Sequence, residues 1–171
     1  KNNPTTKKYF RRFISGDDFI NNIVRWCIWL KDIDTKEFRE IREFQERFKE
    51  VKSFREKSTR SGTKRMAELP YLFAEERQPV NDFLVIPKVS SENRKYIPIA
   101  YLTKDYIVSD KTFLIPGTNL FHFGILTSAM HMTWMRYTCG RMKSDFSYSN
   151  TIVYNNYPWP FNPADKQIKS I

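Results

Sequence analysis

The chain has 171 residues, of which 40% are hydrophobic and 16% aromatic. This length and composition are enough to bury a core in about one domain, and they exclude an intrinsically disordered chain. Lysine and arginine number 29 against 19 acidic residues, a formal net charge of +10, which favours nucleic acid or an anionic membrane as the partner.

Three further observations narrow the class of protein. No apolar run approaches the length of a membrane span, and the chain does not start like a signal peptide. The sequence also lacks a basic amphipathic helix with one clean cationic face, so we expect a cytoplasmic protein without membrane contact. Cys27 and Cys139 lack the close spacing of a zinc site, which favours two reduced thiols. The chain opens on Lys1 rather than methionine, and we expect it to be a piece of a longer protein.

The first half of the chain contains one clear helical pattern. Residues 19–30 form an apolar run whose type, helix or strand, the pattern leaves open. Apolar residues then recur at intervals of three and four and predict one face of a long amphipathic helix over 36–57. They are Phe38, Ile41, Phe44, Phe48, Val51 and Phe54. The loop Lys57–Arg65 follows, with hydroxyl side chains and cations suited to phosphate contact.

The second half alternates between strands and a helix. Short runs rich in Ile, Val, Tyr and Phe predict strands over 82–89, 96–102, 107–108, 112–115 and 148–154. Residues 120–138 predict a buried helix with Phe123, Leu126, Met130, Trp134 and Tyr137 on one face. The expected fold is therefore α+β, a single domain with a mixed or antiparallel sheet, one long amphipathic helix and one buried helix.

Catalytic groups are sparse. His122 and His131 lie in apolar helical sequence and are expected to be packed or hydrogen-bonded. His131 and Cys139 are eight residues apart on the predicted helix, about 12 Å along its axis, so they cannot form a catalytic pair. The five glycines are scattered and form no cofactor loop. We therefore expect no catalytic residue, metal or cofactor in these 171 residues.

Several long segments, in order along the chain, resemble motifs of MmeI-like (type IIL) restriction–modification enzymes and their methyltransferase relatives. These segments are residues 11–14, 25–30, 87–99, 123–136 and 139–160. The resemblance implies a target recognition domain over 1–157, followed by the start of a truncated C-terminal helical segment over 158–171. It also implies a bacterial parent whose methyltransferase core, on the same chain, binds S-adenosylmethionine and methylates adenine N6.

A sequence-specific domain of this kind would meet double-stranded DNA through its basic and polar loops. Arg94, Arg141 and Lys143 are expected to hold phosphates, and Lys104, Asp105, Asp110 and Lys111 to read bases, since cations suit guanine and carboxylates suit cytosine. The full set of expected DNA contacts is Arg60, Lys64, Arg65, Ser90, Ser91, Asn93, Arg94, Lys95, Lys104, Asp105, Asp110, Lys111, Arg136, Arg141, Lys143 and Tyr148.

Two other functions stay open on the sequence alone. The basic surface could dock an acidic protein through an aromatic-rich interface. Four tryptophans could equally be core residues or interface anchors: Trp26, Trp29, Trp134 and Trp159. A free-standing enzyme is the weaker alternative, because the catalytic motifs are missing.

Overall fold

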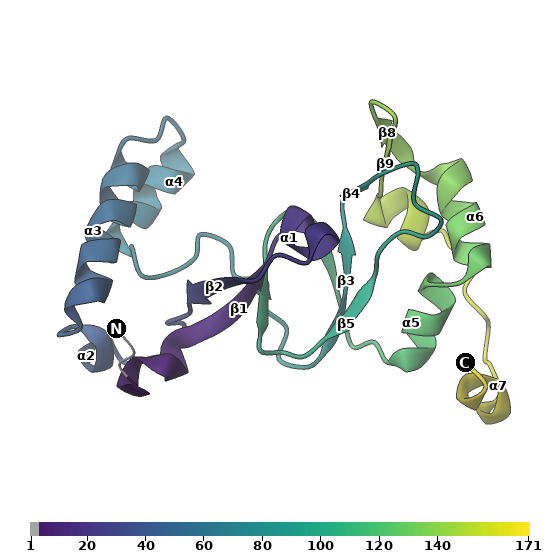
Figure 1. Ribbon diagram of the computed structural model, residues 1–171, viewed down its shortest axis with the longest axis horizontal. Helices are drawn as coiled ribbons and strands as arrows, with labels where there is room; N and C mark the ends of the chain where they lie inside the picture. Colours follow the sequence, from purple (N-terminus) through teal and green to yellow (C-terminus); the bar gives the residue numbers. More distant parts are fainter. Residues whose placement is uncertain (1–3) are drawn as a thin grey trace. The chain divides into compact units, whose positions relative to one another are not determined.

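A computed structural model describes residues 4–171, and Lys1 lies outside that range. The described chain divides into two compact units. The first unit contains Cys27–Arg77 and the described residues up to Arg11, and the second contains Arg12–Trp26 and Gln78–Ile171. The chain passes from one unit to the other three times (Figure 1). No helix in residues 4–171 combines the length and the apolar character that crossing a bilayer requires.

The first unit is mostly helical. Its elements are the 3₁₀ helix η1 (Pro4–Tyr9), the helices α2 (Thr35–Phe38), α3 (Arg42–Glu56) and α4 (Ser61–Arg65), and the 3₁₀ helix η2 (Met66–Glu68). Its core is an aromatic cluster in which Tyr9, Phe38, Phe44 and Phe48 are buried and Tyr71 packs against them. The rings of Phe38 and Phe48 meet edge to face, with centroids 5.8 Å apart.

The single helix expected over 36–57 is interrupted between α2 and α3. At about 100° per residue, an unbroken helix would turn Phe38 about 120° away from Phe44, and the break at Ile41 returns both rings to one core. The same rotation of about 120° over six residues separates Phe54 from Phe48. Phe54, expected on the apolar face, is 75% exposed.

The second unit carries most of the strands. Its elements are α1 (Gly16–Asn21), β3 (Phe83–Pro87), β4 (Val89–Ser90), β5 (Ala100–Leu102), β6 (Tyr106–Val108), β7 (Thr112–Pro116), α5 (Leu120–Leu126), α6 (Ala129–Thr138), β8 (Gly140–Met142), β9 (Asp145–Ser147), the π-helix η3 (Asn150–Tyr154) and α7 (Asp165–Lys169). The strands β1 (Phe10–Ile14) and β2 (Arg25–Ile28) contain the first two passages between units.

The α+β class is confirmed, but the strands form three small sheets rather than one. Each has three strands, in the orders β2-β1-β6, β5-β3-β7 and β4-β9-β8. The β1–β6 pair is parallel, and the pairs within the other two sheets are antiparallel. All five residues of β3 are buried, as expected for a central strand covered on both faces.

The buried helix expected over 120–138 is two helices. The hydroxyl oxygen of Ser128 accepts a hydrogen bond from the backbone N–H of His131 at 3.1 Å and so caps α6. Because α6 starts at Ala129, its buried face differs from the face expected for one long helix. Met132 and Met135 are in the core, whereas Met130 and Tyr137 are 61% and 87% exposed. The strand expected over 148–154 is also wrong, because Ser149 caps the π-helix η3 there.

Candidate nucleic-acid interface

The pairing of β4 with β9 brings two basic segments to the same place. Val89 pairs with Ser147 and Ser90 with Phe146, and β9 continues the hairpin with β8. The polar loop that leaves β4 at Ser91 therefore lies beside the 140–147 hairpin, although about fifty residues of sequence separate them. These two segments, residues 91–95 and 140–147, together with Arg136 are called the basic cluster below.

The 91–95 loop is held by its own turn. The backbone N–H of Arg94 donates to the Ser91 carbonyl at 3.2 Å, and that of Asn93 donates to the Ser91 hydroxyl at 3.3 Å. Asn93 and Lys95 are exposed, whereas Ser91 and Arg94 are half-buried. The Nε of Arg94 is buried, and no hydrogen-bond acceptor among the described residues reaches it. The loop thus offers donors and retains one that is unsatisfied.

Two guanidinium groups gather over one buried ring. The Arg141 guanidinium lies 4.2 Å from the centroid of Phe146, and that of Arg136 lies 5.8 Å from it. Arg141 also donates from Nη1 to the Ser144 carbonyl at 2.8 Å, and Arg136 donates from Nη2 to the Arg94 carbonyl at 3.4 Å. Stacking on an aromatic ring orients an arginine without consuming all its N–H donors. Both side chains are exposed, so their remaining donors can reach an anion.

Lys143 stands at the tip of the same hairpin. It is the first of two residues that join Met142 to Asp145, which pair across β8 and β9. Its φ is 56°, in the left-handed region that normally favours glycine or asparagine. Lys143 therefore holds an exposed cation at a strained backbone position, as is typical of functional turns.

The expected base-reading residues fall at the two ends of β6. Lys104 and Asp105 precede the strand, whereas Asp110 and Lys111 follow it, and all four are exposed. The Lys104 N–H donates to a carboxylate oxygen of Asp82 at 3.0 Å. The Lys111 carbonyl accepts from the Lys88 N–H at 3.0 Å, and Lys88 directly precedes β4. This hydrogen bond connects residues 110–111 to the start of β4, from which the 91–95 loop leaves. The strand β6 separates residues 110–111 from residues 104–105.

Arg60, Lys64 and Arg65 belong to the first unit. The flexible loop expected there is instead the short helix α4, which begins after Arg60 and ends at Arg65. All three cations are exposed, and they belong to one short helical turn rather than to an extended loop.

Ser90 and Tyr148 are corrections to the expected site. They are 2% and 4% exposed, because Ser90 lies within the β4–β9 pair and Tyr148 within the core. The Tyr148 hydroxyl is 3.1 Å from Nε2 of His131, and burial raises the pKa of Tyr148. Neither side chain is accessible to a ligand in this fold. His131 is packed and hydrogen-bonded as expected.

Glu92 and Phe146 are not among the contacts expected from the sequence, but both lie in the basic cluster. Phe146 is 2% exposed and supports both guanidinium groups of the basic cluster. Glu92 lies in the 91–95 loop, and its Oε2 is 3.7 Å from Nη1 of Arg141. A ring between Asp145 and Ser147 is a usual core signal; only the strand pairing reveals what stands over it.

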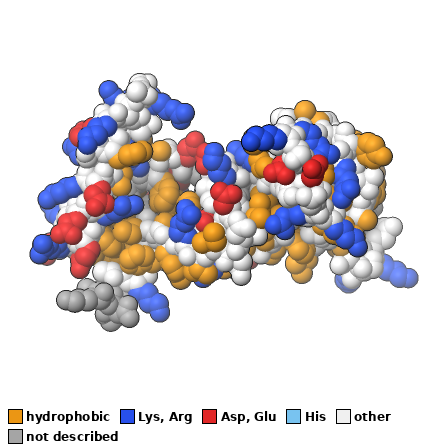
Figure 2. Space-filling model, turned by 45° about the horizontal axis from the view of Figure 1, so that its top comes forward, with side chains coloured by type: hydrophobic (Ala, Val, Ile, Leu, Met, Phe, Trp, Pro, Cys, Tyr) orange, Lys and Arg blue, Asp and Glu red, His pale blue; other side chains and the backbone are white. Residues whose placement is uncertain are grey.

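Charge on the surface is mixed rather than uniform. In Figure 2 the basic side chains on the visible face are interspersed with a smaller number of acidic ones. Among residues 4–171, no three His, Cys, Asp or Glu side chains gather closely enough to hold a metal ion. Burial raises the pKa of the Cys27 thiol to about 11, so this thiol stays protonated and unreactive at neutral pH.

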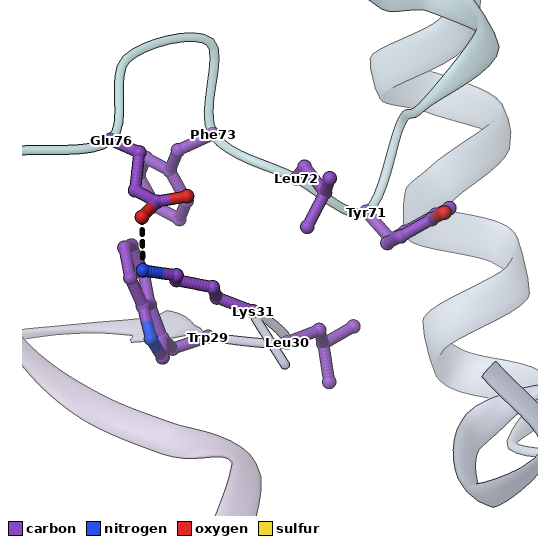
Figure 3. Close-up of a pocket in the computed structure, with 7 residues that line it drawn as sticks. All are labelled: Trp29, Leu30, Lys31, Tyr71, Leu72, Phe73 and Glu76. Carbon is purple, nitrogen blue, oxygen red and sulfur yellow. Dashed lines mark ion pairs between the residues drawn. The ribbon is translucent and has the colours of Figure 1, made fainter. Parts of the chain in front are cut away.

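A pocket in the first unit is lined by seven residues (Figure 3): Trp29, Leu30, Lys31, Tyr71, Leu72, Phe73 and Glu76. The ammonium of Lys31 and the carboxylate of Glu76 form an ion pair beside the ring of Trp29. The cavity volume is about 30 Å³, which suits a water molecule and not a nucleotide. The basic cluster is therefore a better candidate than this pocket for contact with a polyanion.

Two known proteins resemble this chain over nearly its whole length. A DNA methyltransferase A of Bacillus subtilis (strain 168) is 39% identical over 157 residues, which make up 92% of this chain and 18% of that protein. A solved structure of the type IIL restriction–modification enzyme MmeI in complex with DNA matches with a TM-score of 0.88 and 44% identity. That match covers 97% of this chain and 22% of the MmeI chain.

The chain thus spans about a fifth of the length of these relatives. The family described as the MmeI target recognition domain matches residues 1–161, which is nearly the whole chain and includes every strand. The resemblance noted in the sequence is confirmed, and this chain belongs to the MmeI target recognition domain family.

Proposed function

We propose that this chain reads a specific sequence on double-stranded DNA, as one part of a restriction–modification methyltransferase. The family and the relative bound to DNA support the function. The observation that carries its location is the β4–β9 pairing, which joins two donor-rich basic segments. Duplex DNA presents regularly spaced phosphates, and clustered arginines match them better than scattered lysines do.

Within this function the contacts divide into two classes. Arg94, Arg136, Arg141 and Lys143 hold phosphates. Lys104 and Asp105, with Asp110 and Lys111, read bases from the two ends of β6, because lysine donates to guanine and a carboxylate accepts from cytosine. Two separated pairs allow two separate positions of a target sequence to be read. Asn93 and Lys95 extend the phosphate contacts along the 91–95 loop.

The rest of the parent would supply the chemistry. Its methyltransferase core would bind S-adenosylmethionine and transfer the methyl group to adenine N6. Residues 1–157 would form the recognition domain, and 158–171, which include α7, would begin the next segment. A bacterial cytoplasmic location follows from the same proposal, since the DNA is there.

Replacing Arg141 with alanine tests the location directly. We expect the affinity for a random duplex to fall about tenfold and the slope of log K against log salt to become shallower by about one, because one phosphate contact is lost. Fluorescence anisotropy of labelled DNA between low and physiological salt measures both quantities on the 171-residue chain.

The matched control is Arg42→Ala. Arg42 is an exposed arginine of α3 that pairs with Glu46, so its loss changes the net charge equally, and we expect less than a twofold change in affinity. Equal losses for Arg141→Ala and Arg42→Ala would mean that charge alone matters and would refute the proposed location. Displacement of the DNA by an acidic protein, and not by a second duplex, would favour the protein-docking alternative.

Replacing Lys143 with glycine separates binding from stability. Glycine relieves the left-handed strain at φ 56°, and we expect the free energy of unfolding to rise by up to about 1 kcal/mol. The lost cation should weaken DNA binding by about fivefold. Thermal unfolding and anisotropy measure the two effects. Lys143→Ala keeps the strain, so it should show the same binding loss without added stability; a stabilised alanine variant would contradict the strain argument.

A further inference from the structure

The Arg141 guanidinium is fixed before any ligand arrives. Arg141 pairs with Phe146 across β8 and β9, and its guanidinium lies 4.2 Å from the centroid of that ring. The bond from Nη1 to the Ser144 carbonyl, at 2.8 Å, fixes it further. A group held in this way loses little conformational entropy when it binds an anion. Arg141 is therefore a preorganised anion-binding group.

An acidic side chain already stands beside it. Oε2 of Glu92 lies 3.7 Å from Nη1 of Arg141, and the two side chains are 44% and 45% exposed. At 3.7 Å this is an ion pair without a hydrogen bond, and exposed pairs of this kind contribute little stability. The carboxylate thus lowers the local potential without satisfying the guanidinium donors. Such a pair is easily exchanged for a better acceptor.

We propose that Glu92 is a resident counter-ion of Arg141 that a DNA phosphate must displace. This inference rests on the proposed function and adds a control on it. A phosphate can form a bidentate, charge-assisted contact with the guanidinium, which is stronger than the loose carboxylate pair. Displacement leaves the Glu92 carboxylate near the bound phosphate, and the repulsion between them opposes every encounter with DNA.

This arrangement selects for correctly seated DNA. A phosphate that approaches in passing meets the carboxylate and gains little. A phosphate placed by contacts elsewhere in the complex makes the full bidentate contact and overcomes the repulsion. Glu92 would therefore reduce non-specific binding, the electrostatic term that competes with recognition on a long genome. Its location in the turn held by Ser91 and Arg94 keeps it beside the guanidinium.

Glu92→Gln tests the counter-ion role. We expect it to tighten binding to a random duplex about fivefold, because the repulsion is removed while the side chain keeps its size. The same change in an Arg141→Ala background should give less than a twofold effect, because the guanidinium that brings the phosphate to Glu92 is absent. Anisotropy at fixed salt gives all four affinities, and thermal unfolding confirms that each variant is folded.

Asp17→Asn is the matched control, since Asp17 is an exposed acid of the same unit on α1. It should change the affinity less than twofold. Equal tightening by Glu92→Gln in both backgrounds, or by Asp17→Asn, would overturn the counter-ion role and leave Arg141 as a phosphate contact. No loss of binding from Arg141→Ala would instead overturn the proposed interface, so the two failures are distinguishable.

Discussion

Replacing Arg55 with alanine should destabilise the first unit by about 3 kcal/mol, because one side chain holds three backbone carbonyls. Nη1 donates to the carbonyls of Met66 and Leu69 at 2.7 and 2.8 Å, and Nη2 donates to that of Leu72 at 2.7 Å. Met66 lies in η2, and Leu69 and Leu72 lie in the segment that follows it. This segment includes Tyr71, which packs on the aromatic core. Partial burial also lowers the pKa of Arg55, but an arginine stays charged in a protein.

Lysine should not rescue this position. The ammonium group is a compact donor and cannot span three acceptors as the planar guanidinium does, so Arg55→Lys should recover less than half of the loss. Arg47→Ala is the matched control, since Arg47 lies on the same helix and forms only an exposed pair with Glu50. It should cost less than about 0.5 kcal/mol. Urea unfolding measures the loss of stability, and hydrogen exchange of the backbone amides within residues 66–72 measures the local effect. Unchanged protection of these amides in Arg55→Ala would contradict the role of Arg55.

Acidification from pH 7 to pH 4 should cost about 3 kcal/mol of stability through His131 alone. Burial lowers the pKa of His131 from 6.5 to about 4. The unfolded chain therefore takes up a proton near pH 6.5 that the folded chain refuses until about pH 4. The stability is complete above the unfolded pKa and falls as the pH drops between these two values. Burial raises the pKa of the adjacent Tyr148 and Tyr157, so neither tyrosine titrates in this range.

His131→Gln should flatten the pH dependence. Glutamine can still meet the Tyr148 hydroxyl but binds no proton in either state. The comparison is therefore between slopes of unfolding free energy against pH, not between absolute stabilities. We expect the slope between pH 6 and pH 4.5 to fall by about 1 kcal/mol per pH unit relative to the parent chain. Urea unfolding at a series of pH values measures it. Parallel curves for the two chains would show that folding does not lower the pKa of His131, and would contradict the prediction.

The sequence predicted some strands of the second unit closely, but it missed β8 and β9 and placed a strand over 148–154 where a π-helix forms. Short runs rich in Ile, Val, Tyr and Phe located β3, β6 and β7 closely, whereas the run over 96–102 extends beyond β5. Helical periodicity was less secure. Repeated steps of three residues, as around Phe38 and Phe54, shift the apolar side chains around the helix axis. One straight helix therefore cannot keep all of them against the core. A single hydroxyl, that of Ser128, divided the predicted buried helix in two.

The candidate site was only partly predictable. Arg141 and Lys143 stood out by charge, and both are exposed. Ser90 and Tyr148 have the hydrogen-bonding chemistry expected of a DNA contact, but both side chains are buried. Glu92 was not selected, because an acid near basic residues in the sequence does not reveal which guanidinium it faces. Long-range strand pairing decides these points, and no local pattern in the chain encodes it.

The chain crosses between its two units three times, and this has a consequence for protein engineering. The strand β1 pairs with β6 through Arg12, Phe13 and Ile14, which belong to the second unit although they precede most of the first. A chimera that transplants only residues 78–171 would leave β6 without its parallel neighbour. Exchange of specificity between relatives therefore needs a discontinuous graft that also carries Arg12–Trp26, or else a swap of the entire recognition domain.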